Sequence, residues 1–284
     1  MNKIAAKQNE PDQLKLQYAA RIFYNRAEIS NYIVWLLCLL SAAMVFFSDP
    51  TNTLPFAIIF FSDIFAFVFN KYMEKAILVA ADFRKLFDHN VLGLYSDYVY
   101  THNNFTRLAE LKEKVIAGNF RDFTVQLKNT GKDKPPGVRN WYDTNANISG
   151  DLATFECQKE NVWWDKKILI YQWLLYGVIT ILLISVVILL FRAKSLTEVS
   201  LILLSEAGLL IRVCERITVI YQYKKVSIEI DTIVNSFDAF TKHKGVSTLQ
   251  SKIEQRREIP MTHINYFHKK AAKKLTELYI KVKG

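Results

Sequence analysis

The sequence predicts a mainly α-helical integral membrane protein with two transmembrane helical hairpins, a helical domain between them and a basic helical tail. Three observations support this fold class. The chain is 51% hydrophobic yet 23% charged, and its apolar residues are concentrated in two blocks. Each block consists of two apolar segments joined by a short polar stretch. The charged residues lie mostly between the blocks and after the second one.

The changes between polar and apolar composition predict five regions. We expect an N-terminal segment at 1–31, a first hairpin at 32–70, a central domain at 71–167, a second hairpin at 168–221 and a C-terminal region at 222–284. The two hairpins together would supply four transmembrane helices.

The clearest transmembrane segment begins the second hairpin. Ile168–Phe191 is 24 residues long and carries no charge. As a helix it would measure roughly 36 Å, whereas the hydrocarbon core of a bilayer is about 30 Å thick. This segment is therefore predicted to cross a membrane.

The other three apolar segments are weaker. Tyr32–Phe47 is uncharged but only 16 residues long, Leu54–Phe69 contains Asp63, and Leu196–Ile220 contains several charged residues. Each could instead be a buried helix of a soluble domain. However, the segments come in pairs, joined by "SDPTN" and by "RAKSLTE". Two hydrophobic hairpins fit a four-helix membrane bundle better than a globule.

Basic residues predict the orientation in the membrane. The turn of the first hairpin has no Lys or Arg, whereas the opposite helix ends are flanked by Lys71, Lys75, Lys166 and Lys167. Residues 224–284 hold thirteen basic and six acidic residues, a net charge of +7. The positive-inside rule therefore places both termini and the central domain in the cytosol. Arg192 and Lys194 in the second turn are mild evidence against this topology.

The cytosolic parts are predicted to be largely helical. A helix is predicted after residue 73, because apolar residues recur there at helical spacing: Ala76, Val79, Phe83 and Phe87. One interpretation is that this helix continues the second apolar segment. Gly and Pro residues predict a loop at 128–140. The basic tail has an apolar stripe, which would either pack on the central domain or lie on an anionic membrane surface.

No catalytic or metal-binding constellation is evident. The five histidines lack metal-ligand spacing, and neither a GxSxG motif nor a glycine-rich nucleotide fingerprint occurs. We therefore predict that the protein is not an enzyme, has no metal or cofactor, and does not bind DNA or RNA.

Polar residues within the apolar segments are the stronger functional signal. Asp63 lies near the middle of the second segment, where a charge costs about 3 kcal/mol on insertion scales. In the fourth segment, Glu198, Ser205, Arg212 and Arg216 fall within roughly 40° of one another on a helix. Glu206 flanks this stripe. The groups could pair within the bundle, for instance Asp63 with Arg212, or they could line an aqueous path. Because four helices are few for a pore, conduction would imply a homo-oligomer.

Short motifs in the central region resemble a known family. They are Trp141 and Tyr142, then Cys157, Gln158, Lys159 and Asn161, then Trp164 and Asp165. "LFDHNVLGLY" (86–95) and "LQSKIEQRREIP" (249–260) resemble the family's Phe-Asp element and its tail motif. The family is that of the SMODS-associated four-transmembrane effectors, pore-forming proteins of bacterial anti-phage defence. Lys159 stands where the family usually has arginine.

The resemblance implies a function. Such an effector would sense a cyclic oligonucleotide in the cytosol and permeabilise the bacterial inner membrane, an abortive-infection response. A nucleotide ligand needs cations for its phosphates and aromatic rings for its bases, and the candidates are Arg84, Arg139 and Lys159 with Trp141 and Tyr142. The motif around Cys157 would join the sensor to the membrane helices. Two alternatives remain open, a membrane-anchored scaffold without conduction and an ion-coupled transporter.

Overall fold

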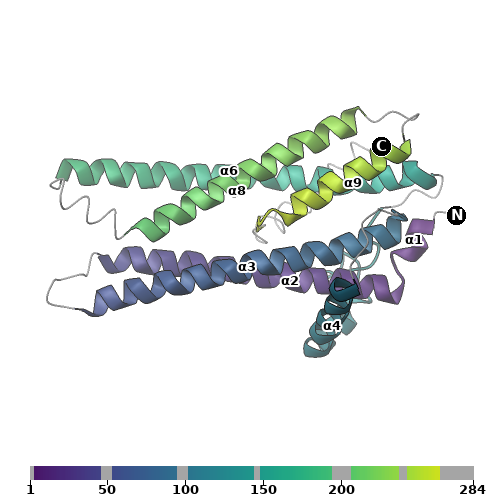
Figure 1. Ribbon diagram of the computed structural model, residues 1–284, viewed down its shortest axis with the longest axis horizontal. Coiled ribbons are helices and arrows are strands. Elements are labelled where there is room, and N and C mark those ends of the chain that lie inside the picture. The colour runs from purple at the N-terminus through teal and green to yellow at the C-terminus, as the bar shows by residue number, and fades with distance from the viewer. Residues whose placement is uncertain are drawn as a thin grey trace. The chain divides into compact units, whose positions relative to one another are not determined.

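The computed structural model describes residues 3–45, 53–94, 102–143, 148–193, 206–236 and 242–262, and these ranges are mainly helical (Figure 1). The helices are α1 (Lys3–Lys7), α2 (Pro11–Val45), α3 (Leu54–Leu92), α4 (His102–Gly118), α5 (Phe120–Gln126), α6 (Gly150–Ala193), α8 (Ala207–Asn235) and α9 (Lys242–Glu258). Within the described residues there is no strand, and one isolated bridge joins Thr130 to Arg139. The predicted helical class is confirmed.

The chain divides into two compact units. The first, here called the polar unit, contains Met1–Arg26, Ala76–Asp165 and Lys225–Pro260. The second, the apolar unit, contains Ala27–Lys75, Lys166–Lys224 and Met261–Gly284. The helices α2, α3, α6 and α8 each contribute residues to both units.

Local sequence explains where the long helices begin and end. Pro11 opens α2 and Asp12 lies in its first turn, positions at which proline and an acid favour a helix start. The C-terminal end of α3 is followed by Gly93, which has a φ of +69°. The Leu94 amide donates to the His89 carbonyl at 3.2 Å. This left-handed glycine with its 6→1 hydrogen bond is a Schellman motif, so α3 stops at Leu92.

The polar unit has a hydrophobic core where α6, α8 and α9 meet. Phe155 and Val162 come from α6, and Ile230 from α8. Leu249 and Ile253 come from α9 and are both fully buried. Because the two α9 residues lie one turn apart, they present one apolar face to the other helices. This packing holds α9 in place beside α6.

The loop after α5 is fixed to α2. Arg21 donates to the Gln126 side chain at 3.1 Å and to the Pro136 carbonyl at 2.8 Å. Gly137 approaches the Asn129 carbonyl so closely that a Cβ atom would lie 1.9 Å from its oxygen. Glycine is therefore required there, and the loop that it closes leads directly to Trp141.

The apolar unit has a smaller core to which four helices contribute. It contains Val34 and Cys38 from α2, Ala66 from α3 and Leu209 from α8, and Leu183 of α6 packs against it. Within this unit α2 and α3 run side by side (Figure 1). Small residues such as Ala66 allow helices to approach closely, as in membrane bundles.

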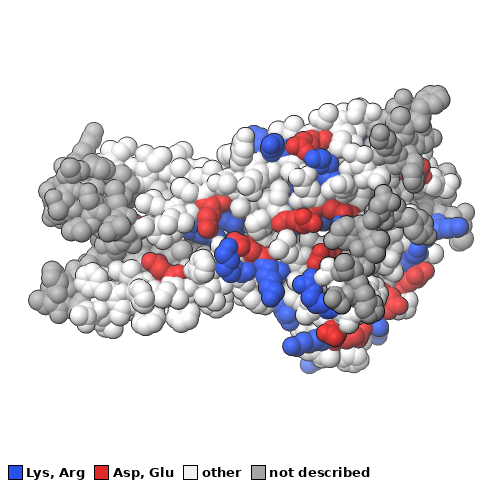
Figure 2. All heavy atoms as spheres, in the orientation of Figure 1, with Lys and Arg blue, Asp and Glu red and all other residues white. Residues whose placement is uncertain are grey.

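Two helices are long and apolar enough to cross a membrane by length and composition. They are Pro11–Met44 and Leu54–Leu92, which contain 18-residue stretches with mean hydropathies of 1.5 and 1.6. Leu36 and Phe60 are more than half exposed there. Figure 2 shows few charges over α2 and α3 where the first ends and the second begins. The described apolar part of α6, Gln172–Ser185, is shorter. Both helices of the predicted first hairpin thus have the character of transmembrane segments.

Candidate functional site

A buried carboxylate forms the centre of the polar unit. Asp88 on α3 is 1% exposed. It accepts hydrogen bonds from Tyr142 Oη at 2.6 Å, from Arg257 Nη1 at 2.6 Å and from Gln250 Nε2 at 3.2 Å. These donors come from two separate chain segments, so Asp88 ties α3 to α9 and to the loop before α6.

The protonation states of this cluster follow from its surroundings. Burial, followed by the neighbouring Asp88 carboxylate, raises the pKa of Tyr142 well above its ordinary value. The phenol therefore stays protonated and donates. Burial alone would lower the pKa of Arg257, but the Asp88 carboxylate outweighs it and raises that pKa. Asp88 and Arg257 thus form a buried ion pair.

Two residues of α6 join the cluster. Asn161 Nδ2 donates to Tyr142 Oη at 3.2 Å. Gln158 is fully buried, and its Nε2 donates to the Val246 carbonyl and to Gln250 Oε1, both at 3.1 Å. Three residues apart on a helix, Gln158 and Asn161 share one face. That face is connected through Tyr142 and Gln250 to Asp88.

A second carboxylate extends the cluster along α9. Glu254 accepts from Lys85 at 2.9 Å, from His89 at 2.7 Å and from Gln250 at 3.0 Å. Burial would raise the pKa of Glu254, but the hydrogen bonds from His89 and Lys85 lower it overall. α3 and α9 are therefore joined by two carboxylates, each surrounded by donors.

The predicted motif residues fall into three groups. Tyr142, Gln158 and Asn161 meet in this cluster, and Trp141 lies beside it on Arg84. Cys157 is buried on α6, whereas Lys159 is half exposed and pairs with Glu156 at 3.8 Å. The side chains of Trp164 and Asp165 lie outside the described residues.

The sequence interpretation did not place Asp88, Gln250, Glu254 or Arg257 in a site. The signals were present, because Asp88 belongs to the "LFDHNVLGLY" element and the other three to "LQSKIEQRREIP". Both elements were recognised as family motifs. Their mutual contact is a tertiary feature that spacing within either element does not reveal.

The three candidate ligand cations differ in setting. Arg84 Cζ lies 3.8 Å from the centre of the Trp141 ring. Arg139 is exposed in the loop after α5, where its backbone amide binds the Asn129 carbonyl. Lys159 lies on the exposed side of α6. The structure thus brings only Arg84 together with one of the predicted aromatic partners.

Arg212 is a deeply buried charge of the apolar unit. It is 3% exposed and donates through its two Nη atoms to Asn70 on α3 and Asn31 on α2. Glu215 lies 3.4 Å away and is nearly half exposed. The suggested pairing of Arg212 with Asp63 is therefore wrong, because the two Nη atoms of Arg212 donate to the side-chain amide oxygens of Asn70 and Asn31.

Of the other polar residues predicted for the apolar unit, Arg216 lies one turn from Arg212 on α8, and Asp63 and Glu206 lie near each other. Arg216 is buried on α8 at 3% exposure, and Glu206 is half-buried beside the start of that helix. Asp63 lies against Gly208, where a Cβ atom would be 2.8 Å from Asp63 Oδ1. Glu198 and Ser205 lie outside the described residues.

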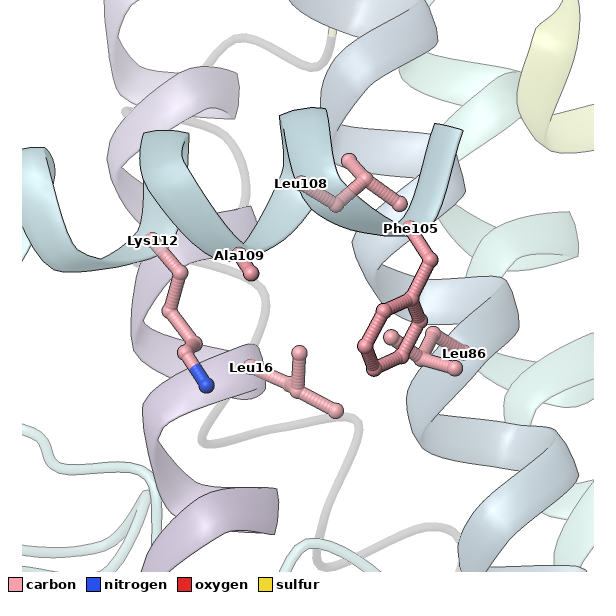
Figure 3. A pocket seen from close by; sticks show the side chains of 6 residues that line it. All are labelled: Leu16, Leu86, Phe105, Leu108, Ala109 and Lys112. Carbon is pink, nitrogen blue, oxygen red and sulfur yellow. The ribbon is translucent and has the colours of Figure 1, made fainter. Parts of the chain in front are cut away.

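Metal-binding clusters are absent from the described ranges, and a small hollow there is largely apolar. No group of three or more His, Cys, Asp or Glu side chains there could hold a metal ion. A small hollow between α2, α3 and α4 is lined by apolar side chains and one lysine (Figure 3). Those residues are Leu16, Leu86, Phe105, Leu108, Ala109 and Lys112. A hollow with one polar group offers little to orient a ligand.

The apolar helices and the separate charged cluster define a helical membrane protein with a folded polar part. Residues 2–218 match the family model of the SMODS-associating 4TM effector domain, and the chain belongs to that family. The resemblance seen in the sequence motifs is thereby confirmed. The protein is a transmembrane effector associated with SMODS cyclic-oligonucleotide signalling. No curated protein and no solved structure matches the chain.

Proposed function

We propose that this protein forms a pore in the bacterial inner membrane when a cyclic oligonucleotide binds its cytosolic part. Opening of the pore dissipates ion gradients and stops growth before phage matures. The chain acts by conduction and not by catalysis, and no cofactor takes part. Both termini and the polar unit lie in the cytosol, and the apolar segments cross the membrane as two hairpins.

The observation that carries this proposal is the environment of Arg212. A buried guanidinium among apolar helices is costly, and a simple lipid anchor does not need one. Here it is held by amides of two other helices, Asn31 and Asn70. These asparagines mark the ends of the apolar stretches that begin at Tyr32 and end at Phe69. Arg212 therefore joins α2, α3 and α8 at one depth in the apolar unit, as a closed gate requires.

Conduction requires more than one copy of the chain. Four helices pack around a core of side chains and leave no wide channel. A pore lined by the polar side of α8 is therefore formed between subunits of a homo-oligomer surrounded by lipid. The half-exposed Glu206 lies beside the start of α8 and would face such a shared path.

The direct test is release of an ion-sensitive dye from liposomes that contain the purified full-length protein. Release would be measured with and without a panel of 3′,3′-cyclic dinucleotides and cyclic triadenylate. Release that requires one of these compounds supports the proposal. Silence with every compound, after correct insertion has been verified by protease protection, favours the membrane-anchored scaffold.

An Arg212→Gln variant tests the role given to Arg212. It loses two hydrogen bonds from a charged donor, each worth about 1.5–3 kcal/mol. We expect the closed state to weaken, so that ligand-free leak rises by at least about tenfold. The control is Lys225→Gln, which removes an exposed charge from the same helix. If Arg212→Gln vesicles stay as tight as the control vesicles, Arg212 does not hold a gate.

A further inference from the structure

Arg84 and Trp141 form an unusual pair in the polar unit. The Arg84 guanidinium carbon lies 3.8 Å from the centre of the Trp141 ring, so the guanidinium is stacked against the indole. The indole is 39% exposed. Arg84 Nη1 is buried, and no described residue accepts a hydrogen bond from it. A buried donor without an acceptor is costly, and a bound anion would supply an acceptor.

The charges around Arg84 favour an anion. Arg257 is the neighbouring cation and Asp88 is the neighbouring carboxylate. With Arg84 itself, two cations against one carboxylate leave one positive charge in excess. Asp88 already accepts three hydrogen bonds from other residues. Arg84 is therefore the cation whose charge is least neutralised within this set.

The other candidates for ligand recognition are less suitable. Tyr142 is 2% exposed and is bound to Asp88, so its ring offers no open face to a base. Lys159 is half exposed and lies near Glu156. Arg139 is exposed in its loop. Neither of these two cations lies against a described aromatic ring.

We propose that Arg84 and Trp141 form the nucleotide-binding site of this effector, with Arg84 holding a phosphate and Trp141 stacking on a base. This assignment rests on the proposed function for the nature of the trigger. Arginine binds phosphate through two parallel hydrogen bonds, and the partly exposed indole offers a stacking surface. The preferred ligand is therefore a nucleotide with an adjacent phosphodiester.

The site also explains how binding is transmitted. Because Arg84 Nη1 is shielded from solvent, a phosphate reaches it only when the stacked Trp141 shifts. Tyr142 follows directly in the chain, and its hydroxyl connects Asp88 on α3 with Asn161 on α6. Displacement of Trp141 thus moves Tyr142, a residue whose hydroxyl oxygen links these two helices.

Binding of labelled 3′,3′-cyclic dinucleotides and cyclic triadenylate to the full-length protein in detergent tests this site. Trp141→Ala should weaken binding by about 5- to 150-fold, the range expected for loss of one base–aromatic stack. Arg84→Gln should weaken it at least as much. Arg139→Gln and Lys159→Gln are matched controls that remove exposed cations and should bind like wild type. Trp141→Phe keeps a ring and should retain most of the affinity.

The outcomes separate this site from the function. Unchanged affinity in both Arg84→Gln and Trp141→Ala overturns the site, even if wild-type vesicles release dye. Absence of wild-type binding across the panel overturns it as well. Loss of binding in these two variants, while both controls bind, supports the site. This binding result supports the site even if wild-type vesicles release no dye, in which case only the pore proposal fails.

Discussion

Loss of the cation beside Asp88 is the most informative perturbation of the polar unit. Asp88 is 1% exposed, and Arg257 Nη1 lies 2.6 Å from its carboxylate. Removing one partner of a buried ion pair costs about 3–5 kcal/mol, because the other charge stays buried without compensation. For a chain of this size that corresponds to a fall in Tm of roughly 6–20 °C. We expect Arg257→Gln to show this loss.

The assay is thermal unfolding of the full-length protein in one detergent, with a double-mutant cycle. Asp88→Asn in the Arg257→Gln background removes the isolated charge and should restore part of the lost Tm. Lys225→Gln, which removes an exposed charge, should leave Tm nearly unchanged. A fall of less than about 2 °C in Arg257→Gln, or no recovery in the double variant, would refute the reasoning that Asp88 is ionised and paired.

Two further predictions concern packing and pH. Gly208→Val should move α8 away from its neighbours, because even a Cβ atom would lie 2.8 Å from Asp63 Oδ1. Crosslinking of Cys38 on α2 to a cysteine introduced at Leu209, which packs in the same core, should then fall, and unchanged crosslinking would contradict the close approach. The pKa of Glu254 is lower in the folded protein than its ordinary value of 4.5. The ionised Glu254 therefore stabilises the fold fully above pH 4.5, and this stabilisation is lost as the pH falls through the lower folded pKa. Wild type should therefore be more stable than Glu254→Gln at pH 7, and their Tm values should converge toward pH 3; a constant difference would show that His89 and Lys85 do not act through the carboxylate charge.

Composition was enough to predict the class of fold. The described part of the first predicted apolar segment, 32–45, lies in α2, and the second, 54–69, lies in α3, as expected from their hydropathy. The continuation of the second segment into a longer helix was also predicted, from the spacing of Ala76 and Phe83. Hydrophobic periodicity is a local property, so a single sequence reveals it.

The partners of the polar residues were not predictable in the same way. Gln158 and Asn161 share a motif, but the residues they contact lie 19 to 92 positions away in the chain. Asp63 was one suggested partner of Arg212, but the Arg212 guanidinium binds Asn70 and Asn31 and lies 3.4 Å from Glu215. A single sequence does not reveal which distant side chains complete a hydrogen-bonding set, because many pairings satisfy the same donors.

The contacts of α9 have a consequence for the order in which the polar unit can assemble. Leu249 and Ile253 bury one side of this helix in the core, and Gln250 and Arg257 bind Asp88. Asp88 precedes these two donors in the chain by 162 and 169 positions. During synthesis the Asp88 side chain therefore lacks both donors until α9 has been made, so the buried ion pair forms only after nearly all of the polar unit has been synthesised.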